Sequence, residues 1–295
     1  MIIYQPAKRA GHYFQVPLCA FAFGASHKER FEAIIAFGIM QAGEKRWNSL
    51  DAQKRQEYLA AVKKAGRLPL DYDKTKPGHI HAVVGADVTN VRLSSISALP
   101  AQHGELSQFK HSFASRHGPD PLVRLKSTLV FEARDGNGVT PRELAVLAAI
   151  FSVVGKKQGP VLITQNRIRR RALGYKTQAV LDAELSGRKD GTKPLTDWQL
   201  RSTLERLHIR KFFARVTYGC RQTYYSHRMK DDQLRSMVTE RKTFPFASKL
   251  LARINDKTMT DAIRNQRAIA AGKPPPKPNA GPLVLPGKFD PDQVF

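Results

Sequence analysis

Apolar residues recur at helical spacing in several stretches of the N-terminal half. The stretch that begins at Ser26, which is placed to cap a helix, carries an apolar stripe made of Phe31, Ile34, Ile35 and Met40. A second amphipathic segment begins at Ser49 and ends at Gly66, and residues 105–118 predict a short basic helix. These segments predict three helices.

Strand-like runs separate and flank these helices, at 13–23, 79–88 and 122–134. The last of them alternates between apolar and polar positions along its length. The resulting order of helix, helix, strand, helix and strand is typical of a winged helix, and it fits an α+β sheet domain equally well. The sequence leaves both alternatives open.

The C-terminal half opens with a clear helix start. Thr140 is the N-cap, Pro141 occupies the first helical position, and Glu143 completes a capping box. Gly155 ends the helix. A turn precedes this start, so we place a domain boundary near residue 136.

Two further segments follow this helix. Residues 161–164 predict a short strand, and Thr164 caps a helix in which Ile168 and Leu173 are buried and which Gly174 ends. The next stretch, 177–194, separates this helix from a later one. It contains a potential helix of its own at 178–185, which competes with the later helix for the role of recognition helix.

The later helix starts after Thr196 and has a core face of three leucines: Leu200, Leu204 and Leu207. The opposite side predicts a strip of hydrogen-bonding side chains, with Thr203 on its flank: Gln199, Ser202, Arg206 and Arg210. Arginine and glutamine read base edges in the major groove, and serine and arginine also bind phosphates.

A hairpin follows this helix, with strands at 212–218 and 222–228 and a turn at Gly219 and Cys220. Arg215 and Arg221 are expected on or beside its tip. Basic residues also cluster on and after the helix capped by Thr164, where we expect phosphate contacts: Arg167, Arg169, Arg170, Arg171 and Lys176.

The order of these elements, from Thr140 to His227, resembles the winged-helix superfamily of DNA-binding domains over roughly a third of the 295 residues. With a second such domain before it, the chain is weakly similar to plasmid replication initiators, which bind repeated origin sites and recruit host replication proteins. The resemblance implies a sequence-specific DNA-binding protein, initiator-like or regulatory, of a plasmid, phage or mobile element. A nucleic-acid-binding subunit of a larger ribonucleoprotein or defence complex is an alternative.

The charge of the chain supports a nucleic-acid partner, most simply duplex DNA. Lys and Arg total 49 against 25 Asp and Glu, a formal charge of +24. The two cysteines, Cys19 and Cys220, exclude a disulfide scaffold and a cysteine-rich zinc site, and they fit the cytoplasm. No apolar run approaches the roughly 20 residues of a membrane span, so we expect no membrane partner. Whether the chain forms oligomers is open.

One candidate for metal chemistry is the pair His79 and His81. On a strand, both imidazoles would lie on one face. The pair resembles the paired-histidine motif of rolling-circle nickases and relaxases, which implies a bound divalent metal and a tyrosine nucleophile. No tyrosine lies between residues 73 and 174. We therefore expect a non-enzymatic protein without a cofactor, with a nickase as the alternative.

The expected fold class is α+β, with four parts along the chain. They are an N-terminal α+β domain that is a potential divergent winged helix (1–135), a winged helix (136–230), a basic helical extension (231–271) and a proline-rich extended or disordered tail (272–295). The tail ends in DPDQVF, a candidate segment for docking on a protein partner. A frayed terminus is the favoured interpretation of that ending.

Overall fold

The computed structural model describes residues 2–3, 12–93, 95–155, 157, 159–186, 194–218 and 222–240. Packing divides the chain into a larger unit, Met1–Lys157 with Ile163–Phe213, and a smaller unit, Gln158–Leu162 with Ala214–Phe295. The boundary expected near residue 136 lies inside the larger unit. Separate folding of 1–135 and 136–230 stays a prediction. The expected tail, the hairpin turn and most of the basic extension lie outside the described residues.

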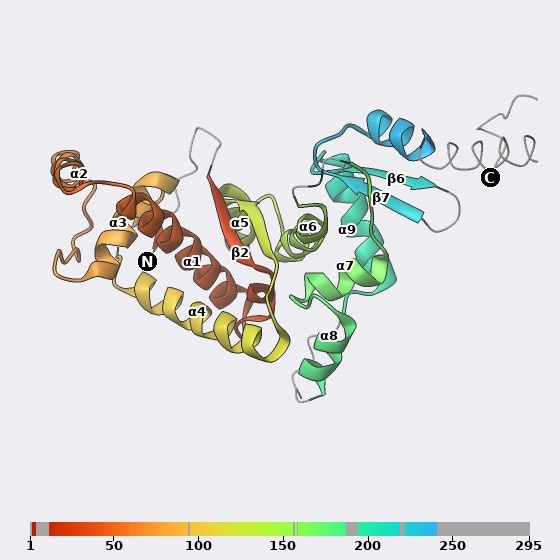
Figure 1. The fold of residues 1–295 in the computed structure, drawn as a ribbon, viewed down its shortest axis with the longest axis horizontal. Coiled ribbons are helices and arrows are strands. Elements are labelled where there is room, and N and C mark those ends of the chain that lie inside the picture. Colours follow the sequence, from red (N-terminus) through yellow and green to blue (C-terminus); the bar gives the residue numbers. More distant parts are fainter. Residues whose placement is uncertain are drawn as a thin grey trace, which may run out of the picture. The chain divides into compact units, whose positions relative to one another are not determined.

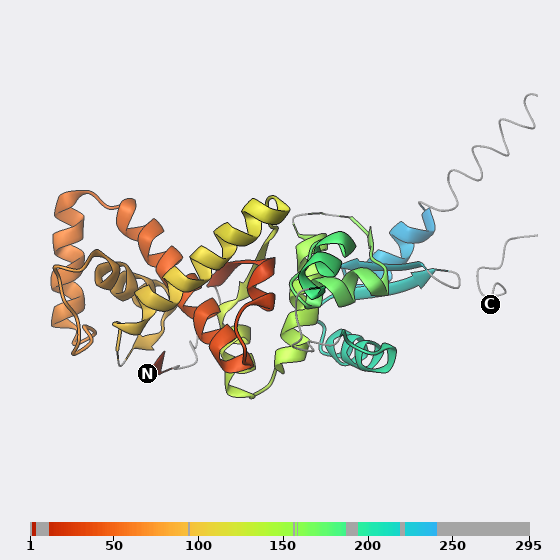
Figure 2. The ribbon, with the colours of Figure 1, turned by 90° about the horizontal axis from the view of Figure 1, so that it is seen from below.

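The first part of the larger unit is built around the long helix α1, which packs against α3, α4, α5 and β2 (Figure 1). Figure 2 shows α4 beside α1 from a second direction. Strands β2 and β4 pair antiparallel, with Tyr13 opposite Lys126, and the two-residue strands β1 and β3 also pair. The elements are β1 (Ile2–Ile3), β2 (Tyr13–Pro17), the 3-10 helix η1 (Leu18–Ala22), α1 (His27–Asn48), α2 (Ala52–Lys64), α3 (Pro77–Thr89), β3 (Arg92–Leu93), α4 (Ala98–His117), β4 (Leu122–Lys126) and α5 (Ser127–Asp135).

Helices α1 and α3 approach each other closely because glycines occupy the crossing. A Cβ added to Gly85 would overlap the carbonyl oxygen of Ile39, and one added to Gly43 would overlap that of His81. Since each glycine faces the backbone of the other helix, neither helix can move aside without losing its packing. This crossing carries much of the apolar core, including Ile34, Ile35 and Val84.

Substitution of Gly85 by alanine is expected to destabilise the protein by about 1–3 kcal/mol, because the added methyl group forces the two backbones apart. Gly104→Ala is the matched control, since Gly104 lies in α4 with open space around its Cβ position. The control should be neutral or should stabilise by about 0.5–1 kcal/mol, because alanine favours a helix. Urea unfolding measures the free energy of unfolding of both variants. Equal changes in the two would contradict the close contact between α1 and α3 at Gly85.

Asp71 ties the loop before α3 to the backbone just ahead of α4. Its carboxylate accepts hydrogen bonds from Ser95 Oγ at 2.7 Å, from the Ile96 N–H at 2.9 Å and from the Ser97 N–H at 2.9 Å. Burial by itself would raise the pKa of Asp71, but these hydrogen bonds together hold the pKa well below its usual range. Stability therefore depends on the ionised form.

Asp71→Asn is expected to lower the free energy of unfolding by about 1 kcal/mol at neutral pH, because a neutral amide accepts these bonds less strongly. A lowered folded-state pKa means that the stabilisation is present above the unfolded-state pKa of about 3.9 and is lost as the pH falls below it. The gap between wild type and variant should therefore shrink in acid. Glu105→Gln, at an exposed position on α4, is the control, and its free energy of unfolding should equal that of the wild type. If the difference between wild type and Asp71→Asn persists in acid, ionised Asp71 is not the source of the stabilisation.

The second part of the larger unit consists of four helices: α6 (Pro141–Val154), α7 (Gln165–Ala172), α8 (Gln178–Leu185) and α9 (Asp197–Ile209). The capping box of Thr140 and Glu143 is confirmed, as are the caps Thr164 and Thr196. Helix α6 is almost entirely buried, packs against α7 and α9, and also contacts β4.

The smaller unit is a three-stranded antiparallel sheet with one described helix. The strands are β5 (Val161–Leu162), β6 (Ala214–Tyr218) and β7 (Gln222–Ser226), in the order β5-β7-β6. Residues 231–240 are helical, and Leu234 and Val238 pack against Ala214 and Val216. The hairpin strands expected after α9 are thus confirmed. Together with the larger unit, the sheet confirms the α+β class.

Several expected elements of the N-terminal half are wrong. Residues 79–88 form most of helix α3 and not a strand, because Pro77 starts a helix whose apolar residues pack on α1. The strand expected at 122–134 ends at Lys126, where the apolar spacing changes and α5 begins. The strand at 13–23 likewise gives way to η1 at Leu18. The order expected of a second winged helix is therefore absent from the described residues.

Helix boundaries differ less from expectation. Ser26 caps α1 and forms a full capping box with Glu29. Ser49 does not cap the second helix, because it ends α1, and Asp51 caps α2 by accepting the Lys54 N–H at 2.8 Å. The basic helix expected at 105–118 extends back to Ala98 as α4.

Candidate nucleic-acid interface

Helix α9 is held in place by its first turn and by its leucine face. Thr196 Oγ1 accepts the Gln199 N–H at 3.2 Å, and Gln199 Oε1 accepts the Thr196 N–H at 3.1 Å. The leucine face is fully buried, as expected: Leu200, Leu204 and Leu207. The side-chain oxygen of Gln199 is thus used by the capping box.

The side of α9 opposite the leucines is not a cationic strip. At 100° per residue, the four residues directly opposite are Trp198, Ser202, Glu205 and Ile209. Trp198 is 75% exposed and Ile209 is 69% exposed. Of the strip expected on this side, only Ser202 lies directly opposite the leucines, whereas Gln199, Arg206 and Arg210 lie on one flank. The exposed Trp198, which the same helical spacing places opposite the leucines, is not among the residues expected from the sequence.

Arg206 and Arg210 lie on the flank of α9 that faces α6, where both contact Glu143. Arg206 Nε donates to Glu143 Oε1 at 3.1 Å, and Arg210 Nη1 lies 3.5 Å from Glu143 Oε2. Arg210 Nη1 also donates to the Gly138 carbonyl at 3.1 Å. The Glu143 side chain is 4% exposed, whereas that of Arg206 is 52% exposed. The two arginines thus neutralise a buried carboxylate while part of each remains accessible.

Thr203 does not belong to the expected contact surface, because it is completely buried. It lies between Leu200 and Leu207 on the face of α9 that packs into the core. Its Oγ1 has no hydrogen-bond partner among the residues that the structure describes.

Two arginines of α7 are also used inside the protein. Arg169 forms an ion pair with Asp197 at the start of α9 and donates to Asn166 Oδ1 at 3.3 Å. Arg171 is buried, and its Nη1 donates to Ser152 Oγ on α6 at 2.7 Å. Burial, together with the charges of Arg167 and Arg170, lowers the pKa of Arg171 to about 10. Arg171 is therefore a packing residue and no longer a candidate for phosphate contact.

Arg167 and Arg170 are the cations of α7 that remain available. Both side chains are half-buried, and within the described ranges neither has a carboxylate or hydrogen-bond partner for its guanidinium group. Arg167 and Arg170 are three residues apart on α7 and so lie on one side of the helix. Burial and then the charge of Arg167 lower the pKa of Arg170. Such a pair favours binding of an anion.

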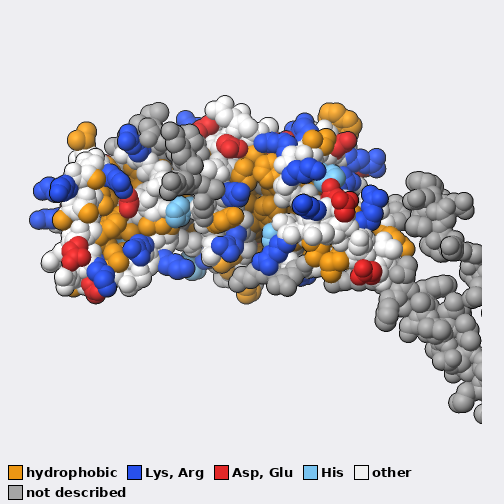
Figure 3. Space-filling view, turned by 90° about the horizontal axis from the view of Figure 1, so that it is seen from above, with side chains coloured by type: hydrophobic (Ala, Val, Ile, Leu, Met, Phe, Trp, Pro, Cys, Tyr) orange, Lys and Arg blue, Asp and Glu red, His pale blue; other side chains and the backbone are white. Residues whose placement is uncertain are grey.

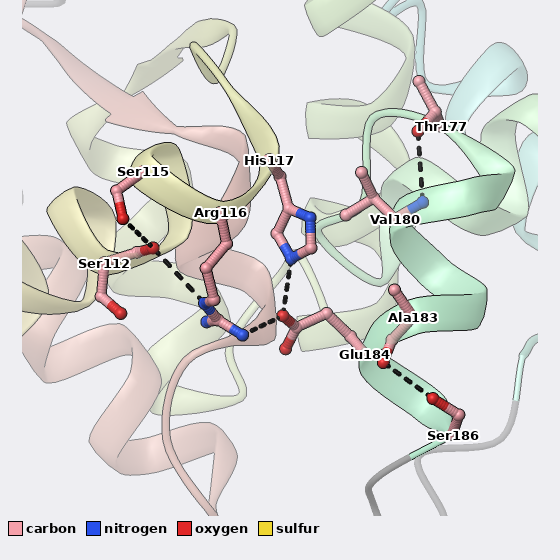
Figure 4. Close-up of polar contacts among 9 residues, drawn as sticks. All are labelled: Ser112, Ser115, Arg116, His117, Thr177, Val180, Ala183, Glu184 and Ser186. Carbon is pink, nitrogen blue, oxygen red and sulfur yellow. Dashed lines mark hydrogen bonds and ion pairs between the residues drawn. The ribbon is translucent and has the colours of Figure 1, made fainter.

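Helix α8 is committed to packing against α4, as Figure 4 shows. Glu184, whose side chain is 9% exposed, pairs with Arg116, and His117 Nε2 lies 2.7 Å from Glu184 Oε1. Val180 and Leu181 belong to an apolar cluster with Cys19, Ala22, Phe113 and Tyr175. Lys176, just before α8, donates to the Pro119 carbonyl at 2.9 Å. The choice between α8 and α9 as a recognition helix stays a prediction.

The remaining expected contact residues lie in or beside the hairpin and on α9. The backbone N–H of Arg215 on β6 donates to Asp231 Oδ1 at 3.0 Å, and its side chain is half-buried. Ser202 is partly exposed on α9. Arg221 lies outside the described residues. Figure 3 shows lysine and arginine side chains scattered among acidic and apolar ones.

The histidine pair does not form a metal site. His79 and His81 lie on α3, where two positions differ by about 200°, so their side chains leave the helix in different directions. His79 is buried, and its Nδ1 lies 3.3 Å from the Asp73 N–H. The described part of the chain contains no group of three potential metal ligands. The strand geometry on which the nickase alternative depended is therefore wrong.

Comparisons of the chain with protein-family models, with curated proteins and with solved structures find no match. Within the described ranges, no helix combines the length and the apolar character that a membrane crossing requires. The candidate interface therefore rests on the geometry of this chain alone.

Arg206→Ala is expected to lower the free energy of unfolding by about 1–3 kcal/mol, because it leaves a buried carboxylate with one cation fewer. Arg201→Ala, which removes an exposed arginine of the same helix, should change it by less than about 0.5 kcal/mol. Urea unfolding measures both. Addition of Glu143→Gln to Arg206→Ala should recover part of the loss, and additive effects would contradict a direct Glu143–Arg206 interaction.

Proposed function

We propose that this protein binds nucleic acid, most simply duplex DNA, through the part of the chain from α6 to β7, whose order of elements resembles a winged helix. The observation that carries the proposal is the sheet order β5-β7-β6. The short strand between α6 and α7 pairs with β7 of the hairpin that follows α9. The chain order is helix, strand, helix, helix, helix and hairpin, with α8 as an additional helix between α7 and α9. The buried leucine face and the capping box of α9 support its role as the recognition helix.

Electrostatics supports a polyanionic partner. The formal charge is +24, so many cations must lack an acidic partner whatever the local pairing. On α7, Arg167 and Arg170 meet this condition among the described residues, and Arg201 and Ser202 lie on the accessible surface of α9. We assign phosphate contacts to Arg167 and Arg170. Arg206 and Arg210 can contact DNA only through the guanidinium N–H groups that do not bind Glu143 or the Gly138 carbonyl.

Binding then proceeds by electrostatic capture followed by contact of α9 with the duplex. From the resemblance of this order to a winged helix, we assign the chain the role of an initiator-like or regulatory DNA-binding protein of a plasmid, phage or mobile element. Sequence specificity would come from the accessible side chains of α9, and a non-specific component would come from the phosphate contacts.

The double variant Arg167→Ala, Arg170→Ala is expected to bind duplex DNA more weakly and with a smaller salt dependence. Loss of two phosphate contacts should reduce the slope of log affinity against log salt by about 2. Fluorescence anisotropy with a labelled duplex, over a series of salt concentrations, gives both quantities.

The matched control is Lys63→Ala, Lys64→Ala, which removes the same charge from the exposed last turn of α2. It should leave the salt slope nearly unchanged. Equal losses in the two double variants would show that binding depends on net charge alone and would contradict the assignment to α7. An absence of salt-dependent binding by the wild-type chain would contradict the proposed function.

A further inference from the structure

Trp198 is a large exposed aromatic residue that the local structure does not use. It is 75% exposed on the first turn of α9. Its neighbours all have structural roles: Asp197 pairs with Arg169, Thr196 and Gln199 form the capping box, and Leu200 is buried. Among the described residues, Trp198 has no ring partner and no cation above its ring.

The other tryptophan of the chain shows the contrast. Trp47 is half-buried, and the guanidinium carbon of Arg55 lies 5.2 Å from the centre of its ring. Tryptophan offers no particular advantage in helix propensity, so the turn of α9 would form equally well with a polar residue at position 198. An indole that is left in water therefore indicates a ligand with an apolar face.

The surroundings of Trp198 indicate the chemistry of that ligand. Arg169 joins the start of α9 to α7, whose Arg167 and Arg170 are the available cations described above. Arg201 is exposed one helical turn beyond Trp198 and has no ionic partner in the described part of the chain. An exposed aromatic ring among arginines is the combination that binds a nucleic-acid strand by stacking on its bases while cations hold its phosphates.

We propose that Trp198 stacks on an unpaired base, so that this end of α9 binds single-stranded or locally opened nucleic acid. The inference rests on the proposed nucleic-acid binding and specifies a second form of its substrate. A base inside a duplex has both faces covered by its neighbours, so a protein ring can stack only where a strand is single, ends or is opened. Because every base has a flat face, the contact is tolerant of sequence.

The test uses the full chain with Trp47→Phe, which leaves Trp198 as the only tryptophan. Its emission is followed during titration with a short oligothymidylate and with a closed hairpin duplex of mixed sequence. We expect quenching by the oligothymidylate and little change with the duplex.

Variants of Trp198 complete the test, with affinities measured by anisotropy. Trp198→Ala should weaken oligothymidylate binding roughly 5- to 100-fold while duplex affinity is retained, and Trp198→Phe should keep most of the affinity. Ile209→Ala, which removes an exposed aliphatic side chain from the same face of α9, is the control and should change neither.

Three results would overturn the inference while leaving the proposed function in place. The first is tryptophan emission that does not change when oligothymidylate binds. The second is a loss of affinity in Trp198→Ala that is equal for single strands and duplex. The third is a Trp198→Ala variant in which only the oligomeric state changes and both affinities are retained. Failure of the wild-type chain to bind either form of nucleic acid would instead remove the proposed function itself.

Discussion

The buried carboxylate of Glu143 determines how the candidate interface is built. It closes the capping box of α6 and accepts a hydrogen bond from Arg206, and it lies beside Arg210. A buried carboxylate without cations would be strongly destabilising, so the packing of α9 on α6 requires these arginines to point toward Glu143. Their first role is therefore structural, and any contact with a ligand must be made by the part of each guanidinium group that remains exposed.

The same use of charge recurs elsewhere in the larger unit. Glu184 binds Arg116 and His117 and fixes α8 to α4, and Arg169 binds Asp197 and links α7 to α9. Arg171 is buried and donates to Ser152 Oγ, which links α7 to α6 without a carboxylate. Basic residues in this protein thus join helices to one another, and clustering in sequence does not by itself identify a binding surface.

Local signals could be predicted from the sequence, and non-local ones could not. The caps at Ser26, Thr140 and Thr196 depend on residues three positions away, and all were predicted. The leucine face of α9 follows from helical spacing alone. By contrast, the partner of Arg206 lies 63 residues away in the chain, so its pairing with Glu143 is visible only in the fold. The sequence predicts a strand at residues 79–88, because a short apolar run fits either a strand or a buried helix. The close packing of Gly85 on α1, which belongs to the helical structure, is not visible in the local sequence.

Internal pairing nevertheless leaves about half of the positive charge without an acidic partner. With 49 Lys and Arg against 25 Asp and Glu, pairing every acid with one base would still leave 49 − 25 = 24 cations. Acids that bind two cations, as Glu143 does, reduce the number of free bases further, but each such site keeps a net positive charge. This excess of positive charge supports the proposed polyanionic partner even where individual arginines are held by the fold. In the proposed function, electrostatics accounts for capture, whereas discrimination between sequences falls to accessible uncharged groups of α9 such as Ser202, because stacking on Trp198 is tolerant of sequence.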